Sequence, residues 1–241
     1  FFFFFCFFVF VFFFFFFLFF FFVFAFFLFF ALSKNVFYYD QFARKADWTN
    51  RWDIKAWDLA EKNILVVGFG RIGSRLVKRA KAFDMNVFVY DPYVNPSEIK
   101  NYGAVHVDNY KAILAKMDAV SLHCPKNEET TDMFSSEEFS MMKDTSFLIN
   151  CARGGIVNEL ALHEALTAKK IRAAGLDVYD DEPSTSSNPL FSLENVLLSP
   201  HIAGVTVEAT IRMSKQSVQN VLDFFDNKIN PEVIINKNVL L

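Results

Sequence analysis

The amino-acid sequence predicts an α/β fold built around a parallel sheet, and three observations lead to this prediction. From about Asn63 onward, short apolar runs rich in β-forming residues alternate with amphipathic stretches of helical period. A glycine-rich turn, Gly68–Gly73, follows the first apolar run and opens the first helical stretch. Polar and ionisable residues follow most of the later runs. Strands and helices that alternate in this way form a parallel sheet with helices on both faces.

The candidate strands are short and almost wholly apolar. Because they show no alternation of polar and apolar residues, we expect them to be buried on both faces, as strands of parallel sheets are. The seven runs are Asn63–Gly68, Asn86–Tyr90, Ala104–Val107, Ala119–His123, Ser146–Asn150, Ala173–Asp177 and Val196–Ser199.

The candidate helices lie between these runs. Ser135 with Glu138 has the spacing of a capping box, and Asn158 stands where the N-cap of another helix is expected. A long amphipathic stretch follows the last strand. The helical stretches are Arg71–Phe83, Ser97–Asn101, Tyr110–Lys116, Ser136–Met142, Glu159–Lys169 and Val205–Asn227.

Residues 1–32 form an apolar leader that is mostly Phe. The chain has 34 Phe in 241 residues, 23 of them in the first 30 positions, and no charged residue precedes Lys34. Most residues that interrupt the Phe run lie one nucleotide from a Phe codon, and only Ala25 needs two changes. We interpret the leader as a translated pyrimidine-rich repeat or a mis-set gene start that lies outside the fold. The alternative is a membrane anchor, because a run of eighteen or more apolar residues can span a bilayer.

The rest of the chain divides into three parts. Residues 33–58 carry Trp48, Trp52 and Trp57 among charged residues, which indicates a linker with a helix that packs on a neighbouring surface or between subunits. Residues 59–229 hold the strands, the helices and the glycine turn. Residues 230–241 follow the last helix and leave this domain.

Charge and cysteine content exclude several classes of protein. The formal net charge is −3 without basic clusters, which gives no electrostatic footprint for nucleic acid. Cys6, Cys124 and Cys151 are odd in number and widely spaced, so they form neither a disulfide framework nor a CxxC metal site. We predict no metal site, and the cysteine pattern fits the reducing cytoplasm.

The glycine turn predicts a dinucleotide site in a Rossmann-type, doubly wound sheet. Gly68 allows the tight turn, Gly70 lets the backbone approach a pyrophosphate, and Gly73 lets helix and strand pack closely. Asp91 ends the next strand, where a carboxylate can accept hydrogen bonds from the adenosine ribose hydroxyls. A 2′-phosphate would be repelled there, so the sequence favours NAD over NADP.

The residues after the strands converge on one edge of the predicted sheet. Ligands of open α/β sheets bind outside the carboxyl ends of the strands, so this edge is the expected site. The groups placed there are the glycine turn, Asp91, His123 to Pro125, Asn150 to Gly155, Asp177 to Pro183, and Ser199 to His201.

Two residues at this edge suit the reduction of a 2-oxo acid by hydride transfer. Such a reaction needs a cation for the carboxylate and the carbonyl oxygen, and a proton donor for the new hydroxyl. Arg153, flanked by glycines, can bind a carboxylate with two parallel hydrogen bonds. His201 can exchange a proton near neutral pH, and a neighbouring carboxylate would hold its ring.

At these residues the sequence resembles the D-isomer-specific 2-hydroxyacid dehydrogenases. The resemblance covers roughly residues 45–235 and is carried by four blocks. These are Val66–Tyr93, Met142–Asn158 (MKDTSFLINCARGGIVN), Gly175–Tyr179 with Glu182 and Pro183, and Pro200–Gly204.

The resemblance implies roles for individual residues. Arg153 would bind the substrate carboxylate, His201 would be the acid and base, and Glu182 would orient His201. By sequence alone Glu182 belongs to an acidic run that is typical of a solvated loop, so its role rests on the resemblance. Asp177 would hold the nicotinamide carboxamide. The other implied NAD contacts are Gly68, Gly70, Arg71, Ile72, Gly73, Asp91, Cys124, Pro125, Cys151, Ala152 and Gly204.

The resemblance also implies a second, substrate-binding domain. The Phe run stands where its N-terminal segment is expected, and residues 230–241 would be its remnant, so we expect the substrate domain to be largely missing. The chain would then bind NAD but turn over poorly.

For the function we expect NAD-dependent oxidation of a D-2-hydroxy acid or the reverse reduction, in a homo-oligomer. The likeness is greatest to members that use 3-phosphoglycerate in serine synthesis. Glyoxylate, hydroxypyruvate and D-lactate are alternative substrates, and an NAD-sensing corepressor-like module is the alternative class. Glu182 argues against the formate dehydrogenase branch, which uses an amide at that position.

Overall fold

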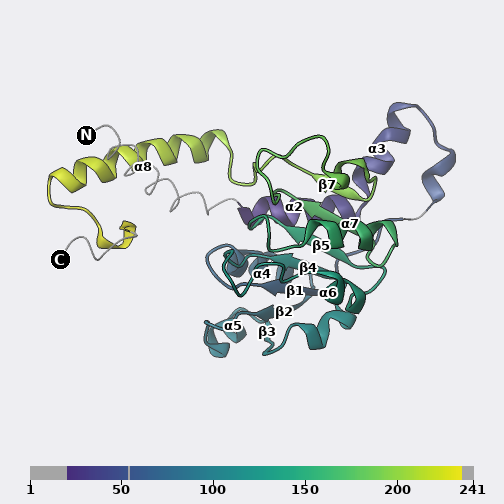
Figure 1. The fold of residues 1–241 in the computed structure, drawn as a ribbon, viewed down its shortest axis with the longest axis horizontal. Helices are drawn as coiled ribbons and strands as arrows, with labels where there is room; N and C mark the ends of the chain where they lie inside the picture. Colours follow the sequence, from purple (N-terminus) through teal and green to yellow (C-terminus); the bar gives the residue numbers. More distant parts are fainter. Residues whose placement is uncertain (1–20, 54, 235–241) are drawn as a thin grey trace. The chain divides into compact units, whose positions relative to one another are not determined.

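The computed structural model describes residues 21–53 and 55–234 and contains a seven-stranded, all-parallel sheet (Figure 1). The order β3-β2-β1-β4-β5-β6-β7 reverses direction beside β1, which is the doubly wound arrangement. The predicted α/β fold is therefore confirmed. The strands are β1 (Asn63–Val67), β2 (Asn86–Tyr90), β3 (Val105–His106), β4 (Ala119–Leu122), β5 (Phe147–Asn150), β6 (Ala173–Leu176) and β7 (Val196–Leu198).

All seven predicted strands are present; β2 has the predicted bounds, and no end of the other strands differs by more than one residue. Most predicted strands include one further polar or small residue at an end, such as Gly68, His123 and Asp177. In the structure these residues begin the loops that follow the sheet, and these loops form the candidate site.

Helices and short 3-10 turns precede the first strand, connect the strands and follow the last one. Arg71 precedes its helix, and the stretch after Tyr110 is a 3-10 helix instead of the predicted amphipathic α-helix. The elements are α2 (Phe21–Ser33), α3 (Val36–Arg44), η2 (Thr49–Trp52), α4 (Gly73–Ala82), α5 (Pro96–Asn101), η3 (Lys111–Lys116), α6 (Ser136–Met141), α7 (Glu159–Thr167), η4 (Pro189–Ser192), α8 (Val207–Phe225) and η5 (Pro231–Val233).

Local capping fixes several helix starts. The capping box of Ser135 and Glu138 is formed at α6, and the Asn158 side chain accepts a hydrogen bond from the amide of Ala161 at α7 (2.9 Å). Both caps were predicted from the sequence. They set where the chain turns from the sheet edge back into a helix.

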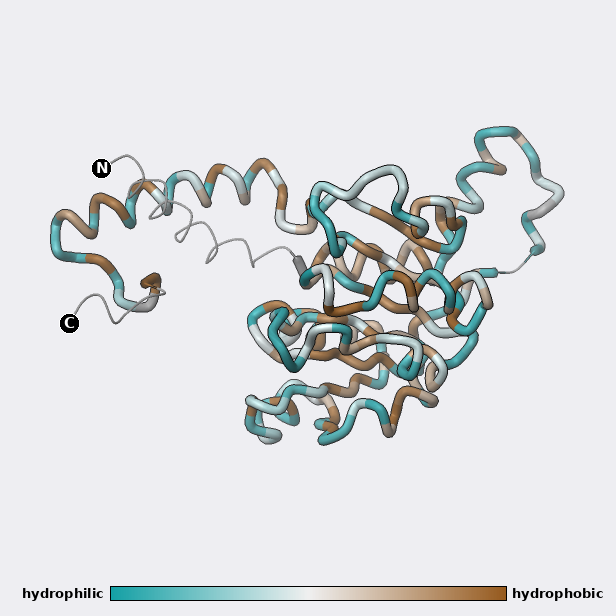
Figure 2. The backbone as a smooth tube through the Cα atoms, in the orientation of Figure 1, coloured by the Kyte–Doolittle hydropathy of each residue, from teal (hydrophilic) through white to brown (hydrophobic). Residues whose placement is uncertain are grey.

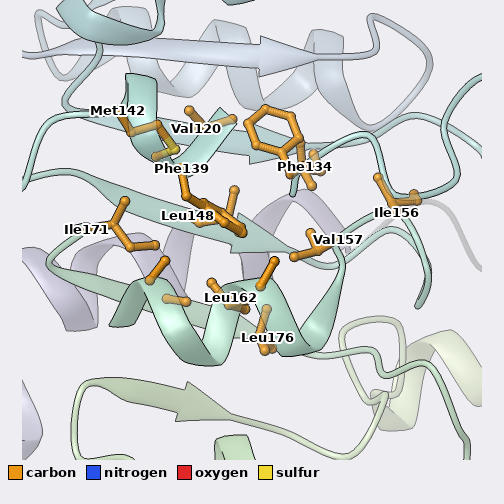
Figure 3. Packing of buried hydrophobic residues seen from close by; sticks show 14 of the residues in the cluster. Val120, Phe134, Phe139, Met142, Leu148, Ile156, Val157, Leu162, Ile171 and Leu176 are labelled. Carbon is orange, nitrogen blue, oxygen red and sulfur yellow. The ribbon is translucent and has the colours of Figure 1, made fainter. Parts of the chain in front are cut away.

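One face of the sheet is covered by α6 and α7. Leu148 of β5 and Leu176 of β6 point into a buried cluster with Phe139 of α6 and Leu162 of α7 (Figure 3). Figure 2 shows the strands as hydrophobic segments of the chain between hydrophilic loops. Each fully buried side chain of this size stabilises the fold by about 1.5–3 kcal/mol.

The other face is covered by α4 and, contrary to expectation, by the end of the leader. Phe147 and Gly175, on the opposite side of β5 and β6, face α2: a Cβ on Gly175 would lie 3.0 Å from the Cβ of Leu28, and the rings of Phe29 and Phe147 are 6.3 Å apart. Ala25, Leu28 and Phe29 are at most 2% exposed. The interpretation that all of residues 1–32 lie outside the fold therefore does not hold for the part from Phe22, because this helix fills the apolar face of the sheet. The rest of that interpretation concerns residues 1–20, which lie outside the described part.

The segment after α2 packs back on the same domain. The amide of Trp57 donates a hydrogen bond to the carbonyl of Ser33 (2.9 Å), and its ring stacks on Phe147 at 5.0 Å. Trp48 and Trp52, in contrast, are 71% and 73% exposed. The predicted linker with a helix is thus partly anchored and partly exposed.

The chain forms two compact units, residues 22–203 and a second unit that contains α8 and η5. Within the second unit, Thr206 caps α8 by accepting a hydrogen bond from the amide of Ala209 (3.0 Å). Residues 235–241 of the predicted C-terminal remnant lie outside the described part. Among the described residues no single helix is long and apolar enough to cross a membrane; α2 and α3 meet that test only as a pair bent by 61°.

Candidate active site

The strand register brings the predicted site residues to one edge of the sheet. Val67 pairs with Tyr90 and with Leu122, Leu122 pairs with Asn150, and Asn150 pairs with Leu176, which pairs with Leu198. These are the last residues of six of the strands, so the residues that follow them emerge side by side. The carboxyl edge therefore carries Gly68, Asp91, His123, Cys151, Asp177 and Ser199.

The glycine turn has the geometry that dinucleotide binding requires. Gly68 has φ +95°, and a Cβ there would lie 2.7 Å from the carbonyl carbon of His123. A Cβ on Gly73 would lie 2.0 Å from the carbonyl oxygen of Gly68, so only glycine lets α4 pack this closely on the turn. A Cβ on Gly70 would meet nothing within 4 Å, which leaves the backbone open to a ligand. Arg71 and Ile72 continue this turn into the N-terminus of α4.

A pocket of about 200 Å³ opens beside this turn. Its lining includes five predicted NAD contacts: Gly68, Gly70, Asp91, Cys124 and Pro125. The Asp91 carboxylate accepts hydrogen bonds from the amides of Phe69 (2.7 Å) and Tyr93 (2.9 Å), one on each oxygen. A carboxylate has about four acceptor positions, so both oxygens can still accept from a ribose. The Tyr93 hydroxyl donates to Glu129 (2.6 Å), which adds a second carboxylate to the pocket.

The two cysteines at this edge are poor nucleophiles. Burial raises the pKa of the Cys124 thiol to about 11 and raises the pKa of Cys151 well above its usual value. Both thiols are therefore protonated near neutral pH. Cys124 lines the pocket beside the glycine turn, and Cys151 is buried.

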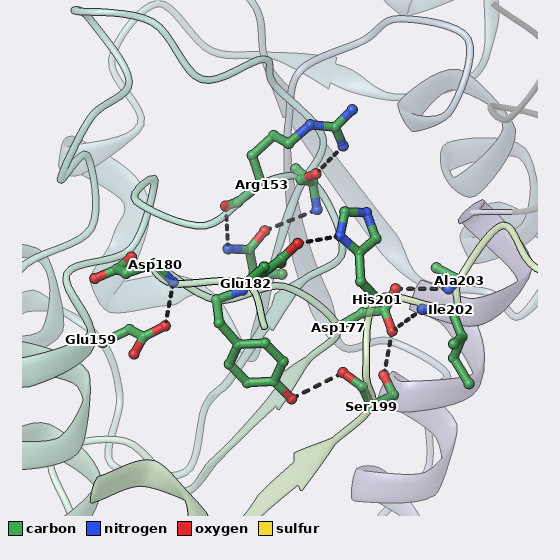
Figure 4. Close-up of polar contacts among 12 residues, drawn as sticks. Arg153, Glu159, Asp177, Asp180, Glu182, Ser199, His201, Ile202 and Ala203 are labelled. Atoms are coloured by element: carbon green, nitrogen blue, oxygen red, sulfur yellow. Dashed lines mark hydrogen bonds and ion pairs between the residues drawn. The ribbon is translucent and has the colours of Figure 1, made fainter. Parts of the chain in front are cut away.

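His201 and Glu182 form a close pair (Figure 4). The Nδ1 of His201 lies 2.6 Å from Oε2 of Glu182, and both side chains are about one-third exposed. An ionised carboxylate only accepts hydrogen bonds, so Nδ1 carries the proton and donates it to Glu182. This leaves Nε2 as the ring atom that can exchange a proton with a ligand. Glu182 also accepts from the amide of Tyr179 at its other oxygen (2.9 Å).

Hydrogen bonds to Asp177 hold the turn at His201. His201 has φ +52°, a left-handed conformation that is costly for a residue other than glycine. The fully buried Asp177 carboxylate accepts hydrogen bonds from the amides of Ile202 (2.9 Å) and Ala203 (2.7 Å), and from the Ser199 hydroxyl (2.5 Å). The family resemblance implies a cofactor contact for Asp177, and the structure shows that its carboxylate already anchors this turn.

Arg153 lies with the His201–Glu182 pair in the same view (Figure 4). The side-chain amide of Asn150 donates to the Arg153 carbonyl (3.0 Å), and the amide of Ala152 donates to the Asn150 side-chain oxygen (3.0 Å), which fixes the turn that carries Arg153. Burial lowers the pKa of the Arg153 guanidinium, and the charge of Glu182 opposes this effect. A guanidinium keeps its charge at any physiological pH, so it remains an anion-binding group.

Sequence reasoning missed some residues of this network. Ser199, Asn150 and Tyr179 each hold a turn that carries a candidate catalytic residue. All three belong to the stretches that the sequence places at the carboxyl edge of the sheet, but no role was predicted for any of them. Gly204 belongs to the second unit, so its contact with NAD stays a prediction.

The profile of the D-isomer specific 2-hydroxyacid dehydrogenase NAD-binding domain matches residues 26–203. The chain belongs to this family. The match begins inside the Phe-rich leader and ends two residues after His201, so it spans the whole sheet and the candidate site.

Relatives that are named for different activities are about equally similar to this chain. The D-3-phosphoglycerate dehydrogenase of Archaeoglobus fulgidus is 37% identical over 193 residues, which are 80% of this chain and 36% of that protein. The glyoxylate reductase of Korarchaeum cryptofilum is 36% identical over 213 residues, 87% of this chain and 64% of that protein. The chain thus spans about a third of the first and less than two-thirds of the second.

A solved structure agrees with the fold. D-lactate dehydrogenase from Aquifex aeolicus, complexed with NAD and lactic acid, superposes with a TM-score of 0.78 at 31% identity. The similarity covers 87% of this chain and 66% of that chain.

The chain therefore contains the NAD-binding domain of this family, and its residues fit the cofactor. The open backbone at Gly70 suits a pyrophosphate, and the Asp91 carboxylate suits a ribose. The neighbouring pocket suits the base. Among the described residues, no group of three His, Cys, Asp or Glu side chains is arranged to hold a metal ion.

Proposed function

We propose that this chain carries the cofactor site and the acid–base pair of a dehydrogenase that interconverts a D-2-hydroxy acid and its 2-oxo acid. The observation that carries the proposal is the hydrogen bond of 2.6 Å between His201 and Glu182, at the sheet edge that also carries Arg153 and the glycine turn. NAD, when bound, would supply or accept the hydride.

The chain's own residues supply binding and proton transfer. Arg153 would hold the substrate carboxylate through its guanidinium and keep the carbonyl carbon in a fixed position. During reduction, Nε2 of His201 would donate a proton to the carbonyl oxygen, and during oxidation it would remove a proton from the hydroxyl. The negative charge of Glu182 would stabilise the imidazolium form and hold the tautomer with the proton on Nδ1.

For the cofactor we propose NAD over NADP. Gly68, Gly70, Arg71, Ile72 and Gly73 would bind the pyrophosphate, and Asp91 would bind the adenosine ribose. Cys124, Pro125, Cys151 and Ala152 would line the path to the reacting edge. Two carboxylates, Asp91 and Glu129, line the pocket and would repel a 2′-phosphate.

For the substrate we propose 3-phosphoglycerate, since the D-3-phosphoglycerate dehydrogenases of two organisms are 37% and 39% identical to this chain. Glyoxylate, hydroxypyruvate and D-lactate are the alternatives, in line with the similarity to glyoxylate reductases and to D-lactate dehydrogenase.

A spectrophotometric assay of the purified chain tests the proposal. NADH formation or consumption is followed with each hydroxy acid and oxo acid, and NAD affinity is measured separately by calorimetry. We expect NAD binding, and slow turnover that is lost in His201→Ala while NAD affinity is kept. NAD binding with no turnover that depends on His201 would instead indicate an NAD-sensing module.

A further inference from the structure

Tyr179 lies at the junction of the turns that carry Arg153, Glu182 and His201. It follows β6 by three residues, and it is 8% exposed. Its ring packs edge-on against Phe191 at a centroid distance of 5.4 Å. No role was expected for this residue, yet three of its groups contact the candidate site.

The backbone of Tyr179 contacts two of these turns. Its amide donates a hydrogen bond to Oε1 of Glu182 (2.9 Å), the oxygen that does not bind His201. Its carbonyl oxygen lies against Gly154, where an added Cβ would be 1.6 Å away. Gly154 follows Arg153 directly, so the Arg153 turn rests on the Tyr179 backbone.

The Tyr179 hydroxyl reaches the third turn. It donates a hydrogen bond to the carbonyl of Ser199 (2.9 Å), and the same carbonyl accepts from the backbone amide of His201 (3.1 Å). The hydroxyl thereby binds the left-handed turn at Ser199, before His201. Asp177 binds the same turn after His201, through the amides of Ile202 and Ala203.

We infer that Tyr179 is a positioning residue for the His201–Glu182 pair: its amide fixes the Glu182 carboxylate, and its hydroxyl fixes the turn that aims the His201 ring at it. The inference rests on the proposed function for its catalytic meaning. The effect of the Tyr179 hydroxyl on the hydrogen bond between His201 and Glu182 can be measured without turnover.

The hydroxyl remains a donor throughout the working pH range. Burial raises the pKa of Tyr179 to about 12, so the group stays protonated at physiological pH. Three carboxylates, Asp177, Glu159 and Glu182, act on the Tyr179 hydroxyl and raise its pKa further. A Tyr179→Phe variant changes none of these charges and keeps the contact with Phe191.

The experiment compares two Tyr→Phe variants of the full chain. Tyr179→Phe removes the hydroxyl in question. Tyr110→Phe removes a partly buried hydroxyl that donates to the carbonyl of Met133 (3.2 Å) and whose pKa burial likewise raises to about 12, so it is a matched control. The readout is the proton resonance of His201 Nδ1–H in the nitrogen-15-labelled protein, assigned by its loss in His201→Ala.

We expect Tyr179→Phe to weaken or abolish this resonance and to speed amide exchange at residues 201–203 by about tenfold, the effect of losing one hydrogen bond of ordinary strength. Tyr110→Phe should change neither. Where the chain turns over, kcat should fall by a similar factor with NAD affinity unchanged.

Two outcomes would overturn the inference: an unchanged resonance and exchange rate in Tyr179→Phe, or equal changes in both variants. Should Tyr179→Phe fail to fold, Asp177→Asn gives a second test. It weakens the hydrogen bonds that hold the same turn after His201, so it should also weaken the His201 resonance. An intact resonance in a chain without any turnover would count against the proposed dehydrogenase function alone.

Discussion

At the scale of single residues, the carboxylate of Glu182 is the hydrogen-bond partner of the His201 ring in the proposed mechanism. Its Oε2 accepts from Nδ1 of His201 at 2.6 Å. Glu182→Gln keeps the shape but loses the charge that stabilises the imidazolium, so we expect kcat to fall by about 10- to 1,000-fold with little change in NAD affinity. Asp181→Asn, the same change at the neighbouring position, should leave kcat within about twofold. Steady-state kinetics of both variants decides, and equal losses would remove Glu182 from the mechanism.

Asp91 and Glu129 place two carboxylates in the lining of the pocket beside the glycine turn, where we propose that the adenosine ribose binds. Replacing either with its amide removes a charge that would repel a 2′-phosphate but keeps a hydrogen-bond acceptor. We expect the preference for NAD over NADP, measured as the ratio of the two dissociation constants, to fall by about tenfold in Asp91→Asn and by less in Glu129→Gln. Calorimetric titration with both cofactors measures it. A ratio unchanged in both variants would show that these charges do not set the preference.

The thiol of Cys124 gives a prediction of pH dependence. A thiol reacts as its thiolate, and burial raises the pKa of Cys124 to about 11, so the reactive form is scarce below that pH and increases as the pH rises toward it. At about pH 8.5, the usual pKa of a free thiol, iodoacetamide should label Cys124 and Cys151 quickly in urea and slowly in the folded chain. Site-resolved mass spectrometry follows both. Fast labelling of folded Cys124 would contradict the buried, protonated state.

The residues differ in how far the sequence could predict their place. Arg153 and His201 stand just after strands, and parallel strands bring such positions to one edge, so they could be predicted. Glu182 sits beside Asp180 and Asp181, so its own residue pattern did not distinguish it and its pairing with His201 was predicted only through the family resemblance. In the structure Glu182 contacts His201, while Asp180 accepts a hydrogen bond from the amide of Gly155 (2.7 Å). Tyr179 acts through its backbone and a contact twenty positions along the chain, which no local pattern encodes.

At the scale of elements, α2 shows how a biased composition can hide a helix. A run of nearly identical side chains has no amphipathic pattern, so its period could not be read. Its interruptions did carry a signal: Ala25 and Leu28 are three residues apart on one face, and both are buried against the domain. Ala25, the substitution that needs two codon changes, is fully buried. Several strands are one residue shorter than predicted for a different reason. Their last predicted residues, such as His123 and Asp177, lie in the loops of the candidate site.

Two phenylalanines of α2 test whether this helix belongs to the domain. Phe29 is 2% exposed and lies against Trp57 and Phe147, whereas Phe27 is 48% exposed. We expect Phe29→Ala to lower the free energy of unfolding by about 3–5 kcal/mol, the usual effect of emptying a buried aromatic site. Phe27→Ala should lower it by less than about 1 kcal/mol. Urea unfolding measures both. Equal small decreases in the two variants would show that α2 does not contribute to the stability of the domain.

At the scale of the whole molecule, parallel topology explains why the candidate site residues lie together. All strands run in the same direction, so the glycine turn, the His201–Glu182 pair and Arg153 lie on loops at the same edge of the sheet. The sequence could predict this convergence because it depends only on strand order and direction. The substrate does not depend on strand order in this way, and relatives named for different substrates are about equally similar to this chain, so the substrate is stated as a proposal.

The exposed tryptophans of the segment between α3 and β1 lead to a last prediction, on self-association. Trp48 and Trp52 are 71% and 73% exposed, while hydrogen bonds from Tyr38 to the side chain of Asp53 (2.9 Å) and from Tyr39 to its carbonyl (2.8 Å) hold the segment in shape. Large aromatic side chains presented by a fixed segment are typical of the centres of protein interfaces.

We expect the chain to sediment at about twice its mass of 27.9 kDa. The double variant Trp48→Ser and Trp52→Ser should shift it toward the monomer, whereas Leu160→Ser, which removes an apolar side chain that is 69% exposed on α7, should not. Sedimentation velocity over a range of concentrations distinguishes these results, and a wild-type chain that stays monomeric throughout would show that the two tryptophans serve some other contact.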